Sequence, residues 1–154
     1  MMFVTAMGFL VVAVATPSLA APPKPPKDPA SITVSVSPKA VSRGGQTEVT
    51  VVLRPIQGVK INRYPKIKLE VPGQSGLVDD AEVSVGNASP PPPDAKESNY
   101  FDTVDPVQLE LRVDASAPVG LHAIAGKLTY YYCVTASGFC APARVPLKIP
   151  VEVR

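Results

Sequence analysis

The sequence predicts an all-β protein, an antiparallel β-sandwich, and two observations support that fold class. Apolar and polar residues alternate with a period of two over most of the chain, which is typical of strands with one buried face. Nineteen prolines and ten glycines interrupt the chain often, and no segment of useful length shows a helical period. Frequent turns between short alternating segments favour a sandwich over a helical bundle.

The expected strands follow one another along the chain, separated by turn signals. In residues 107–113 the four apolar side chains point to one face and the polar ones to the other. The last strand carries Pro146 and Pro150, which cannot donate ladder hydrogen bonds, so we expect it at a sheet edge or paired on one side only. The full set is 32–37, 46–54, 59–62, 67–71, 81–85, 107–113, 121–133 and 144–153.

Seven or eight short strands in one domain favour an immunoglobulin-like antiparallel β-sandwich over residues 31–154. The inter-sheet disulfide familiar from that class is not expected. The two cysteines, Cys133 and Cys140, are too close in sequence to bridge two distant strands.

The first residues predict an export signal. An apolar core runs from Met7 to Ala15, and Ser18 and Ala20 supply small residues for cleavage after Ala20. We therefore interpret residues 1–20 as a signal peptide and residues 21–30 as a proline-rich, extended lead-in. No Lys or Arg precedes the apolar core, and an uncleaved membrane anchor remains the alternative, although the core is shorter than the roughly 20 residues that span a bilayer.

Composition argues against several classes of partner and cofactor. The 15 basic and 13 acidic residues nearly cancel, so a net charge of +2 favours neither nucleic acid nor an anionic membrane surface. Two cysteines and the single His122 do not supply the three or four ligands of a zinc site. No phosphate-binding loop or catalytic triad stands out. We expect neither a metal nor a cofactor.

The cysteines flank a predicted hairpin tip in which Ser137-Gly138 is the turn signal. An oxidising compartment, such as the periplasm or another part of the cell envelope, would let them pair. A bridge that closes about eight residues contributes roughly 2.5 kcal/mol, so it is a weak means of holding a sandwich together. Because an exposed bridge at a hairpin end is also easily reached by a partner thiolate, a structural bridge and a thiol–disulfide exchange site both remain open.

One segment, residues 86–106, fits no strand pattern. It holds four consecutive prolines and then Tyr100-Phe101 within a polar stretch. Loops of this length are usually functional or disordered. An aromatic pair in such a loop needs a hydrophobic partner, either the core or a neighbouring site.

The cysteine hairpin resembles a known family. Leu128-Thr129-Tyr130-Tyr131-Tyr132-Cys133, followed by Ser137-Gly138-Phe139-Cys140-Ala141-Pro142, is similar to the N-terminal periplasmic domain of the thiol:disulfide interchange protein DsbD. Val145-Pro146-Leu147 is similar to its closing strand. The chain departs from the family in having six residues between the cysteines rather than five, and Lys60 and Asn62 where the family has tyrosines.

The resemblance implies an immunoglobulin-like fold and an exported module that relays electrons between a thioredoxin-like donor and envelope disulfides. It implies that Cys140 forms the mixed disulfide, that Cys133 resolves it, and that Tyr100 or Phe101 caps the pair. A membrane partner would have to be a separate chain. The alternative function is a non-enzymatic immunoglobulin-like binding or structural domain with a fixed hairpin disulfide.

Overall fold

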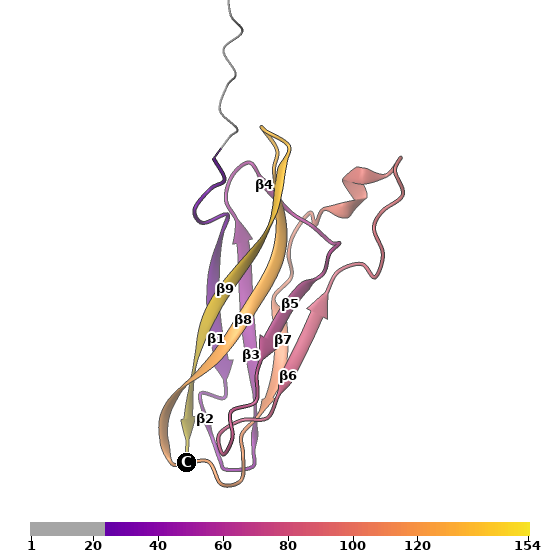
Figure 1. Cartoon of the computed structure of the whole chain (residues 1–154). Coiled ribbons are helices and arrows are strands. Elements are labelled where there is room, and N and C mark those ends of the chain that lie inside the picture. Colours follow the sequence, from indigo (N-terminus) through magenta and orange to yellow (C-terminus); the bar gives the residue numbers. More distant parts are fainter. Residues whose placement is uncertain (1–23) are drawn as a thin grey trace, which may run out of the picture.

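The computed structural model describes residues 24–154, so the predicted export signal over residues 1–20 lies outside the described part. The chain folds into strands that stack as two sheets (Figure 1). In the described part, no helix is long and apolar enough to cross a membrane. The elements are β1 (Ala30–Ser37), β2 (Ala40–Val41), β3 (Gln46–Pro55), β4 (Val59–Ile61), β5 (Ile67–Val71), β6 (Ala81–Val85), the 3-10 helix η1 (Lys96–Asn99), β7 (Val107–Arg112), β8 (Gly120–Val134) and β9 (Phe139–Val153).

The topology is that of an immunoglobulin-like β-sandwich, which confirms the predicted fold class. One sheet has the order β1-β3-β7, and the other has the order β2-β9-β8-β5-β6, with β4 paired to β8. All pairings are antiparallel except that of β2 with β9. The tip of the β8–β9 hairpin, β4 and the η1 loop lie at one end of the molecule, and the C-terminus lies at the other (Figure 1).

The core forms between the sheets from the faces that the alternation predicts. On β3, Val49 and Val51 are fully buried, and on β8 Ile124 and Leu128 are fully buried. Thr47 is the one buried polar residue in the described part, and its hydroxyl donates to the Pro38 carbonyl at 2.8 Å. Burial of one face of each strand therefore fixes the register in which the strands pair.

Apart from shifts of one or two residues at strand ends, β2, the start of β9 and the lead-in differ from the sequence prediction. β2 was not predicted, because two residues are too few to show a period. β9 begins at Phe139 rather than at residue 144, since pairing with β8 extends the strand to the hairpin tip. The lead-in is not free of the domain: Ala30 is buried at the start of β1, and the Pro29 carbonyl accepts the Ile56 amide at 3.1 Å.

β9 is an edge strand over most of its length, as its prolines predict. It pairs with β8 on one side, and on the other only with the two residues of β2. The Glu152 amide donates to the Lys39 carbonyl in the neighbouring segment, so even-numbered amides of β9 point to the outer edge. Pro142, Pro146 and Pro150 share that parity and remove outward donors, which hinders strand addition at this edge.

Candidate functional site

The predicted disulfide forms at the tip of the β8–β9 hairpin. Cys133 and Cys140 lie directly opposite each other in the ladder and are disulfide-bonded, with Cα atoms 4.1 Å apart. One further strand pair, Val134 with Phe139, lies beyond them, and the Gly138 amide closes the turn by donating to the Val134 carbonyl at 2.9 Å. Cys133 is 5% exposed, whereas Cys140 lies on the open edge and is exposed.

A hollow of about 280 Å³ lies beside the disulfide. Its far wall is formed by Glu97 and Tyr100 of the long loop, residues 86–106, which contains η1. Lys60 pairs with Cys133 from the neighbouring strand β4. Its ammonium lies 2.7 Å from a Glu97 carboxylate oxygen and 4.9 Å from the centre of the Tyr100 ring. The hydrogen bond to Glu97 raises the pKa of Lys60. Lys60, the cationic side chain that lines this hollow, is thus already paired with a carboxylate.

Residues 99–101 of the long loop are hydrogen-bonded to the end of β4 and to the chain that follows it. The Asn99 side-chain amide accepts from the Tyr64 amide and donates to the Tyr64 carbonyl, both at 2.9 Å. The Phe101 amide donates to the Ile61 carbonyl at 3.0 Å, and the Arg63 guanidinium donates to the Tyr100 carbonyl at the same distance. These contacts fix the aromatic part of the loop against the sheet.

The two predicted cap residues occupy different places. Tyr100 lines the hollow beside the disulfide, whereas Phe101 does not. Phe101 packs against the core, with the Arg63 guanidinium 4.7 Å from its ring centre. It lines a second hollow of about 710 Å³, together with Val59, Val104 and Pro106. The structure therefore brings Tyr100, and not Phe101, together with Cys133 and Cys140.

Asn62 also lies at the bridge, with its side-chain oxygen 3.5 Å from the Cys133 sulfur. A disulfide sulfur carries no proton, so this is a contact in the oxidised protein; a Cys133 thiol could donate to the same oxygen. Sequence reasoning missed the roles of Asn99, Arg63 and Glu97. No local pattern identifies them, because the Lys60–Glu97 and Asn99–Tyr64 contacts join residues 37 and 35 positions apart.

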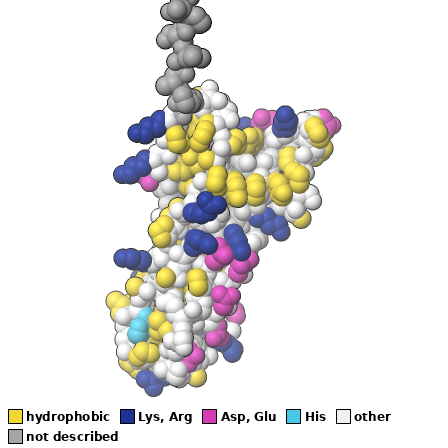
Figure 2. All heavy atoms as spheres, viewed as in Figure 1, with side chains coloured by type: hydrophobic (Ala, Val, Ile, Leu, Met, Phe, Trp, Pro, Cys, Tyr) yellow, Lys and Arg dark blue, Asp and Glu magenta, His cyan; other side chains and the backbone are white. Residues whose placement is uncertain are grey.

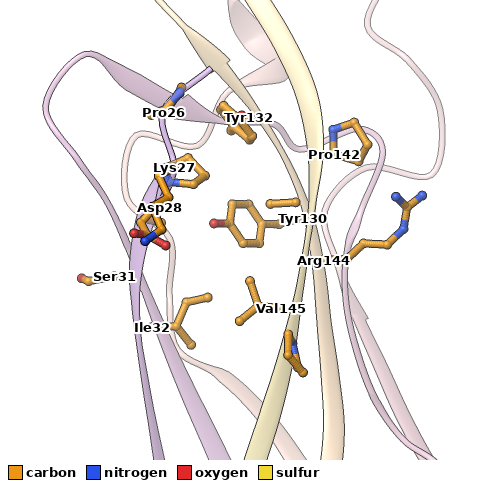
Figure 3. Close-up of a pocket in the computed structure, with 14 residues that line it drawn as sticks. Pro26, Lys27, Asp28, Ser31, Ile32, Tyr130, Tyr132, Pro142, Arg144 and Val145 are labelled. Atoms are coloured by element: carbon orange, nitrogen blue, oxygen red, sulfur yellow. The ribbon is translucent and has the colours of Figure 1, made fainter. Parts of the chain in front are cut away.

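A further hollow of about 620 Å³ lies between the lead-in, β1, β8 and β9. In Figure 3 the Tyr130 ring has Asp28 and Ile32 on one side and Val145 on the other, and Tyr132 lies above it. Burial, then the neighbouring Tyr132 and Asp28, raises the pKa of Tyr130 to about 12. The Tyr130 hydroxyl is therefore held neutral beneath the lead-in.

We expect Gly86→Ala to displace the long loop. Gly86 has a φ of +130°, and a Cβ there would overlap the Arg63 carbonyl, which accepts the Asn87 amide at 2.7 Å. The expected loss is about 3 kcal/mol in the free energy of unfolding, measured by denaturant titration. Gly138→Ala is the matched control: its φ is +68° with no atom within 4 Å of the added Cβ, so we expect a loss of about 1 kcal/mol. Equal losses would contradict the overlap.

The raised pKa of Tyr130 makes the free energy of unfolding fall at alkaline pH. The pKa of Tyr130 in the folded protein lies above the usual value of about 10. Its contribution to the free energy of unfolding is therefore complete below that pH and is lost as the pH rises toward about 12. Comparison of the wild type with Tyr130→Phe isolates this effect. The wild type should lose about 2 kcal/mol more unfolding free energy than the variant over that interval. Parallel pH profiles would show that Tyr130 is not held neutral.

Comparisons with known proteins do not identify a family. No family model and no curated protein matches the chain. Among solved structures, that of murine CRIg is similar over 80% of this chain and 98% of the CRIg chain, with a TM-score of 0.38 and 13% identity. The immunoglobulin-like fold is accordingly assigned from this chain's own strand order and register.

The resemblance to the N-terminal domain of DsbD is wrong. No family model and no curated protein supports it. The specific part of the likeness was confined to the cysteine hairpin. In this hairpin Tyr130 and Tyr132 are buried in the core and Gly138 has a positive φ in the turn, so these shared residues have local structural roles.

Proposed function

We propose that this chain is a non-enzymatic, exported, immunoglobulin-like domain that binds another protein through its disulfide-bearing end, with Cys133–Cys140 as a fixed bridge. The observation that carries the proposal is the position of the bridge in the sheet. Both cysteines occupy regular ladder positions, and Cys133 is also paired to Lys60 on its other side. Cys133 thus has a paired strand on each side, and the residue is 5% exposed.

The bridge is suited to fixing a tip rather than holding the sandwich together. Closing so short a ring contributes roughly 2.5 kcal/mol, whereas thirteen further pairs below the bridge, from Gly120–Val153 to Tyr132–Ala141, continue the ladder without it. A stable tip conformation matters for binding, because side chains held in place lose less entropy when a partner docks.

The disulfide-bearing end also has the composition of a binding surface. On the face in Figure 2, hydrophobic side chains gather over the end where Figure 1 places β4, the hairpin tip and η1. Ile56 in the β3–β4 turn is 44% exposed. Tyr100 and Phe101 line a hollow together with Pro55 and Val59 at the ends of the strands that this turn joins, and the Arg63 guanidinium lies over the Phe101 ring. Aromatic and Arg side chains around hollows are typical of residues that dominate binding energy.

Export is supported by the predicted signal over residues 1–20 and by the disulfide itself, since such bridges persist in oxidising compartments. Both observations favour secretion or the cell envelope. A fixed bridge requires only that the compartment is oxidising.

A redox titration tests the proposal. Because the chain contains no Trp, reduction is best followed by alkylation of free thiols and the resulting mass shift. A fixed bridge should have a reduction potential below about −300 mV, beyond the reach of the glutathione pool. A potential near that of thioredoxin, about −270 mV, or higher would contradict it.

Thiol–disulfide exchange at the same pair is the second candidate, and two observations favour it. The Cys140 side is exposed on the open edge of β9, and Asn62 is placed to accept from a Cys133 thiol. If exchange occurs, Cys133→Ala should trap a partner on Cys140, whereas Cys140→Ala should trap none. The absence of any trapped partner from the Cys133→Ala variant would contradict this candidate.

A further inference from the structure

The outer edge of β1 is unprotected, in contrast to the outer edge of β9. The Ile56 amide donates to the Pro29 carbonyl, and this fixes the parity of the β1–β3 ladder: odd-numbered residues of β1 face β3. The backbone amides and carbonyls of the even-numbered residues, including Ile32 and Val34, therefore point outward. Within residues 24–154, β1 pairs with no strand other than β3.

The residues of β1 offer none of the usual defences of an edge strand. Ala30–Ser37 contains no proline and no charged residue, and its pairing with β3 runs without a bulge from end to end. Edges of this kind are templates for another strand. β9, by comparison, has three prolines whose missing amides would have pointed outward.

Apolar surface lies open next to this edge. A hollow of about 400 Å³ is lined by Val34 and Val36 of β1 and by Leu121 and Pro150 of the other sheet, with Ser35, Lys39 and Glu152 at the same hollow. Leu121 is 77% exposed, the largest value among the large hydrophobic residues of the described part. A strand added to β1 would place alternate side chains over this hollow.

We propose that a second copy of this chain occupies the edge, with the two β1 strands antiparallel about a twofold axis through Thr33. Even-numbered residues then face one another, Ala30 opposite Val36 and Ile32 opposite Val34, twice each. This register uses every outward amide of β1 and forms up to about eight hydrogen bonds. Any other symmetric register leaves outward groups unpaired.

The side chains of the strand suit this register on both faces. On the exposed face, Thr33 meets its own copy and Ser31 meets Ser35, pairs that oppose no charge. On the other face, Ile32 of the second copy would lie beside Val34, over the hollow that Leu121 lines. Pairing would join two three-stranded sheets into one of six strands, and it leaves the disulfide-bearing end free. The inference is independent of the proposed function.

Sedimentation velocity of the full chain over a range of concentrations tests the dimer. Thr33→Lys places like charges at the twofold axis, and we expect it to raise the dimer dissociation constant at least about tenfold. Thr33→Glu should do the same, and an equimolar mixture of the two variants should restore the dimer. Thr50→Lys on β3 is the matched control, because Thr50 lies beside Ser35 but away from the edge, and it should leave dimerisation unchanged.

The result that supports the proposal is a concentration-dependent dimer that each Thr33 variant weakens and the mixture restores. A wild type that stays monomeric at all concentrations would overturn it. So would a dimer that persists in both single variants, because the contact would then lie elsewhere. Circular dichroism of each variant confirms that the sandwich is intact.

Discussion

The pairing of β8 with β9 is the constraint on which the rest of the structure depends. It runs without interruption from Gly120–Val153 to Val134–Phe139, and β2, β4 and β5 all attach to one of these two strands. Ile124 of β8 and Ile149 of β9 are fully buried on the face of the ladder that meets the other sheet. A register shift of one residue would turn that face to solvent, so the core and the hairpin tip are specified together.

The disulfide-bearing end follows from that constraint. Because β8 extends past the sandwich, β4 has a strand to pair with, and the long loop in turn has β4 and its continuation to bind. Asn99 and Arg63 secure that second step through hydrogen bonds to backbone. The site is thus supported in layers. β4 pairs with the β8–β9 ladder, the long loop is bonded to β4 and its continuation, and the disulfide closes the hairpin tip. Such layered support is what positions side chains for recognition.

The fold was predictable because it rests on a repeated local signal. Alternation places Val49, Leu109 and Ile149 on buried faces regardless of what they meet across the core. The edge position of β9 was predictable too, from the chemistry of proline alone. β2 was not, because its two residues are paired only through the approach of distant chain segments.

The candidate site was predictable only where its residues are close in sequence. Cys133 and Cys140 share one hairpin, and their bond follows from local geometry. The roles of Glu97, Asn99 and Asn62 depend on a loop that folds back across many residues, which no periodic pattern encodes. The family resemblance failed for a related reason: a hairpin of a dozen residues reports its own turn and bridge, and not the protein around them.

Native-state hydrogen exchange, compared between the oxidised and the reduced protein, tests most directly whether the ladder rather than the bridge carries the fold. We predict that reduction exposes amides of the tip, around Val134 and Phe139. Amides of Ile124 and Leu128 should keep the protection of the intact sandwich. Loss of protection along the whole of β8 and β9 on reduction would contradict this account, because the disulfide would then be what holds the two strands together.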